Sequence, residues 1–85
     1  MSGGRDRAGD RGGRRPLSPR ERRVLERLAA GDEIPEIAAS MDVTPETVRT
    51  YAKAAMRKLG ARTRPQAVAI ALRVGEIPPV TPPAR

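Results

Sequence analysis

Helix start signals recur along this 85-residue chain and favour an all-α fold. Ser18-Pro19 and Thr44-Pro45 each combine a hydroxyl residue with Pro. The hydroxyl can cap free amides of the first helical turn, and Pro there has a helix-compatible φ angle. Glu21 completes a capping box with Ser18. No stretch alternates apolar and polar residues with a period of two, so the sequence predicts no strand.

Stop signals divide the centre of the chain into four predicted helices. Gly31, Gly60 and Gly75 each follow a segment of helical periodicity, and Gly commonly ends a helix in left-handed backbone. Thr63-Arg64-Pro65 supplies another start signal. We expect a four-helix bundle whose helices begin near residues 19, 35, 45 and 64 and end near residues 30, 41, 59 and 74. The second and third helices flank a tight turn at Asp42-Val43 and form a helix-turn-helix.

The composition predicts three segments. Residues 1–16 are mostly Gly, Arg and Asp, and lack the apolar groups that would offset chain entropy, so we expect a disordered tail. Residues 17–77 hold nearly all the apolar side chains and form the predicted domain. Residues 78–85 are Pro-rich and cannot continue a helix. The arginine-rich tail could reach into a minor groove, or could add only non-specific attraction to DNA.

The net charge of +7 favours a polyanionic partner, either nucleic acid or an acidic membrane surface. The chain has no Trp or Phe to anchor a basic helix in a membrane, and no apolar run approaches the length of a spanning helix. Without Cys, His or a Gly-rich phosphate loop, the sequence predicts neither an enzyme nor a metal or cofactor site. We expect a cytoplasmic, nucleoid-associated protein.

The third predicted helix has two contrasting faces. Its apolar stripe consists of Val48, Tyr51, Ala52, Ala55, Met56 and Leu59. The opposite face carries Arg49, Thr50, Lys53 and Arg57 and no acid. Arg and Lys can donate to guanine, and Thr offers a hydroxyl or a methyl contact, so this face suits the major groove of double-stranded DNA. The alternative is an ordinary solvated helix face.

Six separated blocks resemble the LuxR-type (GerE-type) DNA-binding domain. They span residues 17–77 without a gap, and they are Leu17–Glu21, Leu28–Gly31, Glu36–Ala38, Val43–Thr50, Arg57–Ala61 and Gln66–Val68. The resemblance implies a bacterial transcriptional regulator, with base contacts from Arg49, Thr50 and Lys53. It also implies phosphate contacts at the helix start from Thr44 and Thr47, and further backbone contacts from Arg57 and Lys58.

The resemblance also implies a homodimer on DNA, formed by the fourth helix. The candidate interface residues are Val68, Ala69, Ala71, Leu72 and Arg73. Val68, Ala71 and Leu72 could equally belong to the monomer core.

Three positions depart from the family pattern. Tyr51 stands where His is usual, and could either direct its hydroxyl to a phosphate or be a half-buried core residue. Glu33 stands near the usual place of a hydroxyl cap, which predicts a deficit of about 1 kcal/mol that Pro35 partly offsets. Ala55 replaces a larger aliphatic residue, so we expect a thin core and modest stability.

Most proteins of this type carry a receiver or ligand-binding domain before the DNA-binding domain, whereas here only a short tail precedes it. Because Met1 begins a natural-looking tail, we expect a stand-alone regulator controlled by abundance or by a protein partner. The alternative is an excised fragment. A second functional hypothesis is an interaction module that docks on another regulator or on RNA polymerase, as the similar region-4 domain of sigma factors does.

Overall fold

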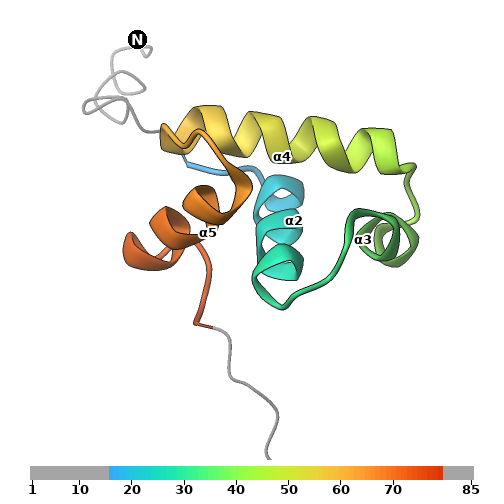
Figure 1. Ribbon diagram of the computed structural model, residues 1–85, viewed down its shortest axis with the longest axis horizontal. Coiled ribbons are helices and arrows are strands. Elements are labelled where there is room, and N and C mark those ends of the chain that lie inside the picture. Colours follow the sequence, from blue (N-terminus) through green and yellow to red (C-terminus); the bar gives the residue numbers. More distant parts are fainter. Residues whose placement is uncertain (1–15, 80–85) are drawn as a thin grey trace, which may run out of the picture.

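Four helices make up the part of the chain that the computed structural model describes, residues 16–79. They are α2 (Pro19–Ala29), α3 (Ile34–Met41), α4 (Pro45–Leu59) and α5 (Arg64–Arg73). Figure 1 shows α4 lying across α2, with α3 and α5 on opposite sides of α2. No strand occurs in residues 16–79, which confirms the all-α prediction. The remainder of both predicted tails, residues 1–15 and 80–85, lies outside the described residues.

The predicted caps begin three of the helices. The Ser18 hydroxyl accepts a hydrogen bond from the Glu21 amide at 3.1 Å, and the Glu21 carboxylate accepts one from the Ser18 amide at 2.8 Å. Thr44 and Thr63 cap α4 and α5, accepting from the amides three residues further on. Each cap satisfies an amide that has no partner within its helix, so the helix starts follow directly from the sequence.

The start of α3 differs from the prediction by one residue. The helix begins at Ile34, with Glu33 as its N-cap residue. The Glu33 amide donates to the carboxylate of Glu36 at 2.7 Å. This bond satisfies an amide at the helix start, so the unusual cap is better supported than Glu33 alone indicates.

Left-handed residues end α3 and α4 and set the turns that follow. Asp42 has φ 60°, and the next residue, Val43, donates its amide to the Ala38 carbonyl at 3.0 Å. The chain then enters α4 through Thr44, which gives the predicted helix-turn-helix of α3 and α4. Gly60 ends α4 with φ 71°, a conformation that costs glycine less than other residues.

Two apolar clusters fix the orientation of α4. One lies toward α5 and comprises Leu17, Leu25, Ala55, Leu59, Ala67, Ile70, Ala71 and Ile77. The other lies toward α3 and comprises Val24, Ile37, Ala38, Val48 and Ala52. Both α2 and α4 contribute to each cluster, so burying the α4 stripe turns its opposite face outward.

The chain after α5 folds back onto α2. Ile77 is only 2% exposed and joins the cluster beside α5. Arg22 donates from Nε to the Glu76 carbonyl at 2.8 Å and pairs with the Glu76 carboxylate at 2.9 Å. The packed part of the molecule therefore reaches from Leu17 to Ile77.

Candidate nucleic-acid interface

The outer side of α4 carries the side chains that the sequence predicts for base contact. Arg49, Thr50, Lys53 and Arg57 are all exposed, and we call these four residues the recognition face. They project away from the stripe formed by Val48, Ala52 and Ala55, which is buried. The two faces of α4 thus lie as the helical spacing predicts, and the recognition face is open to a ligand.

Thr50 makes a hydrogen bond within α4 that limits the groups it can present to a base. Its hydroxyl donates to the Glu46 carbonyl one turn earlier, at 3.2 Å. With the proton used within the helix, the side chain presents its methyl group and the lone pairs of its oxygen. A thymine methyl or a base amino group fits these better than a base acceptor does.

The first turn of α4 brings two hydroxyl groups together. Thr47 donates its amide to the Thr44 hydroxyl at 3.1 Å, and the two hydroxyl oxygens lie 3.0 Å apart. Both residues lie at the positive end of the helix dipole, where an anion is favoured. Thr44 is exposed and Thr47 is half-buried, so the pair lies at the surface.

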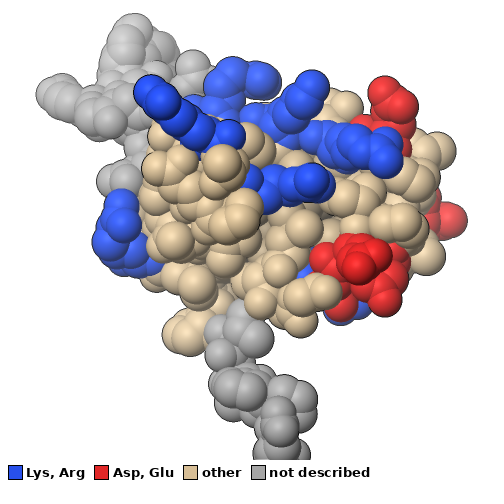
Figure 2. Space-filling view, viewed as in Figure 1, with Lys and Arg blue, Asp and Glu red and all other residues tan. Residues whose placement is uncertain are grey.

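The cations of the recognition face have no acidic partner in the domain. Among residues 16–79, no ion pair joins Arg49, Lys53 or Arg57 to a carboxylate. Figure 2 shows Lys and Arg side chains gathered along the edge that α4 occupies, whereas Asp and Glu gather toward the α3 end. The positive charge of this edge is therefore available to a polyanion.

Lys58 lies apart from the recognition face. Its ammonium group lies 2.8 Å from the carboxylate of Glu21, and its side chain is 27% exposed. The sequence predicted Lys58 as a phosphate contact, but in the structure it bridges the end of α4 to the start of α2. Because the two residues are 37 positions apart, no local pattern in the sequence announces this pair.

Glu21 therefore has two tasks, capping α2 and binding Lys58. Burial acts to raise the pKa of this carboxyl group, which is 7% exposed. The hydrogen bonds from Lys58 and Ser18 and the charge of Lys58 outweigh burial, so the pKa of Glu21 lies below its usual range. The carboxylate is held in its charged form and ties α4 to α2.

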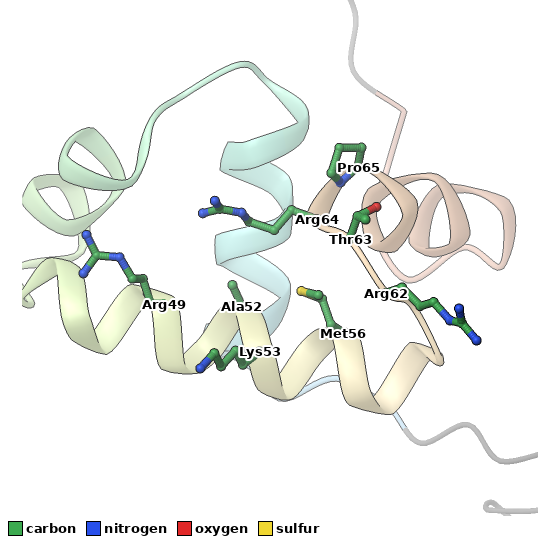
Figure 3. A pocket seen from close by; sticks show the side chains of 8 residues that line it. All are labelled: Arg49, Ala52, Lys53, Met56, Arg62, Thr63, Arg64 and Pro65. Atoms are coloured by element: carbon green, nitrogen blue, oxygen red, sulfur yellow. The ribbon is translucent and has the colours of Figure 1, made fainter.

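A hollow of about 460 Å³ adjoins the recognition face. Figure 3 shows its lining side chains: those from α4 are Arg49, Ala52, Lys53 and Met56, and those from the turn and the start of α5 are Arg62, Thr63, Arg64 and Pro65. Arg62 and Arg64 are not among the residues that the sequence predicts for the site. Two arginines flanking the Thr63 cap, just after the end of the recognition helix, are the pattern that could have pointed to them.

The residues predicted for a dimer interface divide into two groups. Ala71 is fully buried in the cluster beside α5, and Val68 is half-buried against that cluster, so the monomer core uses both. Ala69, Leu72 and Arg73 are exposed, as is the neighbouring Val74. Leu72 and Val74 are the large apolar side chains that the described domain leaves most exposed, each at 37%.

Tyr51 occupies the border between core and surface. It is half-buried and packs against the cluster of Val24, Ile37 and Val48. The ring thus has the half-buried core position that the sequence allowed, and a contact from its hydroxyl to phosphate stays a prediction.

Within residues 16–79, no three His, Cys, Asp or Glu side chains are grouped to hold a metal ion. None of the described helices combines the length and apolar character needed to cross a membrane.

The chain matches a known protein family. Residues 15–71 match the family described as "Bacterial regulatory proteins, luxR family". The chain belongs to the LuxR family. The probable transcriptional regulatory protein NarL of Mycobacterium tuberculosis is 51% identical over 57 residues, which are 67% of this chain and 26% of NarL. This chain therefore matches about a quarter of the length of that relative.

In a shorter relative, the region that matches this chain makes up most of the protein. The spore germination protein GerE of Bacillus subtilis is 43% identical over 61 residues, which are 72% of this chain and 82% of GerE. The solved structure of the transcription factor GerE superposes with a TM-score of 0.70 at 31% identity, over 73% of this chain and 92% of that one. The domain described here is a DNA-binding domain of a transcriptional regulator, and its relatives are regulators rather than enzymes.

Proposed function

We propose that this chain is a sequence-specific transcriptional regulator that inserts α4 into the major groove of double-stranded DNA. Arg49, Thr50 and Lys53 contact base edges in this proposal. Thr44, Thr47 and Arg57 contact phosphates and set the position of the helix. The observation that carries the proposal is that α4 presents exposed cations that pair with no carboxylate of residues 16–79. Its other side is held by the buried apolar stripe and by the pair of Lys58 with Glu21.

Lys58 has a different part in this proposal from the one that the sequence predicted. Its ammonium group is already bound to Glu21, and transferring it to a phosphate would leave that buried carboxylate without its cation. We therefore assign Lys58 to fixing the angle of α4 on the domain rather than to the DNA backbone.

The proposed DNA complex is a homodimer formed through α5. Ala69, Leu72 and Arg73 are the predicted interface residues that remain exposed, and Val68 borders them. Val74 extends the apolar part of this surface. Two-fold symmetry would place one α4 in each of two major-groove segments, about 34–36 Å apart. Leu72 and Val74 are the exposed large apolar side chains among residues 16–79, and two such residues suit a dimer that forms on DNA rather than before it.

Selection from a random-sequence duplex library tests both parts of the proposal. The protein is expected to enrich a two-fold symmetric sequence, and a footprint on the enriched duplex is expected to show two half-sites one helical turn apart. A single unsymmetrical half-site would contradict the dimer. Failure to enrich any sequence would contradict DNA reading, and would favour a module that docks on another regulator or on RNA polymerase.

A further inference from the structure

We propose that the hollow between α4 and the turn into α5 is a second phosphate-binding site, in which Arg62 and Arg64 hold the backbone of one DNA strand. This inference rests on the proposed function, because it needs the duplex to lie against α4. It adds two contact residues from outside the helix-turn-helix, and their effect on binding would not depend on the DNA sequence.

The lining of the hollow has the chemistry of an anion site. Four of its eight lining residues are cationic, namely Arg49, Lys53, Arg62 and Arg64, and none is acidic. The Arg64 side chain extends over the hollow, whereas the Arg62 side chain points outward from its rim (Figure 3). Ala52, Met56 and Pro65 supply apolar surface between them. A cleft with charges of one sign and apolar walls concentrates its field and attracts counter-charge more strongly than a flat surface does.

The arginines of this hollow are free of intramolecular ion pairs in the described part of the chain. The pairs formed there use Arg22, Arg23, Arg27 and Lys58, and neither Arg62 nor Arg64 is among them. Both residues are exposed. Among residues 16–79, therefore, no carboxylate has to be displaced when a phosphate enters.

The backbone beneath the two arginines is already fixed. The Thr63 hydroxyl accepts from the Gln66 amide at 3.2 Å, and the Gln66 side-chain oxygen accepts from the Arg62 amide at 2.7 Å. On the other side, Ala61 donates its amide to the Met56 carbonyl at 2.8 Å. Both ends of the turn are thus held, and binding would order the arginine side chains but not the chain that carries them.

The position of the hollow makes the DNA backbone its natural occupant. Arg49 and Lys53 belong both to the hollow and to the recognition face, so the two surfaces are continuous (Figure 3). A duplex held against the recognition face would bring a strand over the hollow. Each strand carries a phosphate about every 3.4 Å along the helix axis, so a site beside the major groove meets more than one.

Arg64 also borders a second hollow, and the test must distinguish its roles in the two. It lines this second hollow, of about 360 Å³, together with Asp32, Glu33 and Pro35. It forms an ion pair with neither acid, and Asp32 is already paired with Arg27 at 2.7 Å. The two arginines therefore need to be replaced singly as well as together.

The test compares Arg62→Ala, Arg64→Ala and the double variant with wild type on two duplexes, one selected from a random library and one with its sequence scrambled. The slope of log affinity against log salt concentration is expected to become shallower by about 0.9 for each contact removed. In the proposed dimer the double variant removes four such contacts, so between 50 and 200 mM salt it should lose roughly a hundredfold less affinity than wild type does. The ratio of affinities for the two duplexes should stay unchanged.

Arg23→Ala is the matched control, because it removes an exposed arginine on α2, whose pair with Glu26 at 3.7 Å is a surface one. Replacement of both arginines by Lys should restore the slope, since the charge is retained. Ethylation of single phosphates should identify positions that block wild type but not the double variant. A double variant with the slope of Arg23→Ala, and with the ethylation pattern of wild type, would overturn this site while leaving DNA reading by α4 intact.

Discussion

The arginines of α2 and the cations on the outer side of α4 are chemically alike but differ in their neighbours. Three of the four arginines of α2 are paired with acids: Arg22 with Glu76 at 2.9 Å, Arg23 with Glu26 at 3.7 Å and Arg27 with Asp32 at 2.7 Å. On α4, Arg49, Lys53 and Arg57 have no such partner within the described domain. A net charge of +7 does not reveal this difference. The placement of the acids decides which cations a polyanion can reach.

Lys58 sharpens this contrast because it lies on α4 but behaves like the cations of α2. Its partner, Glu21, is buried and also caps α2, so the pair joins the start of one helix to the end of another. Arg57, the preceding residue, is exposed and unpaired among the described residues. Adjacent positions on one helix thus serve different purposes, one stabilising the domain and one available for DNA.

The largest effect on stability is expected for Lys58→Ala. This change leaves the buried carboxylate of Glu21 without its cation, and should lower the free energy of unfolding by about 1–3 kcal/mol. Arg57→Ala is the matched control and should stay within about 0.5 kcal/mol of wild type, because its side chain is exposed. Urea unfolding of both variants measures the difference. Equal losses of unfolding free energy would show that Lys58 stabilises the domain no more than Arg57 does.

A smaller effect is expected at the residues that end α3 and α4. Gly60→Ala forces an L side chain into backbone with φ 71° and should destabilise the domain by about 1–2 kcal/mol, although nothing lies within 4 Å of the added Cβ. Asp42→Gly removes such a side chain at φ 60° and should be neutral or stabilising by less than about 1 kcal/mol. Thermal unfolding compares them, and a stabilising Gly60→Ala would contradict the backbone argument.

The smallest effect on stability is expected when the pH is lowered through the range in which Glu21 titrates. Burial raises the pKa of this carboxyl group and so opposes the hydrogen bonds that lower it. Its folded-state pKa lies below the reference value of 4.5 for the unfolded chain. The stabilisation is therefore present above that pH and is lost as the pH falls through the folded-state pKa. Glu21→Gln should be less stable than wild type at pH 7, and the gap should narrow at pH 3. A gap that widens with acid would reverse the sign of the pKa shift.

Much of the fold follows from local rules that the sequence displays. Ser18, Thr44 and Thr63 cap the helices that they were expected to cap, and the stripe through Val48, Ala52 and Ala55 is buried as its spacing predicts. Caps and helical periodicity act over three or four residues, so one sequence is enough to locate them. The outward position of Arg49 and Lys53 follows from the same periodicity.

Contacts between distant parts of the chain could not be predicted in this way. Lys58 and Glu21 meet because α4 crosses α2, and Ile77 is buried because the chain returns to α2 after α5. Ala71 is small enough for either a core or an interface, and only the packing of α5 assigns it to the core. Arg62 and Arg64 gain meaning only from the hollow that α4 and the turn form together.

The most direct test of the account is the ratio of affinities for a selected and a scrambled duplex, measured at one salt concentration for Arg49→Ala, Lys53→Ala and Arg23→Ala. Each α4 variant is expected to lose about 1–3 kcal/mol of discrimination between the duplexes. Arg23→Ala should keep the wild-type ratio, because it removes the same charge from α2. Equal discrimination in all three variants would show that the unpaired cations of α4 attract DNA without reading it, and would contradict the account.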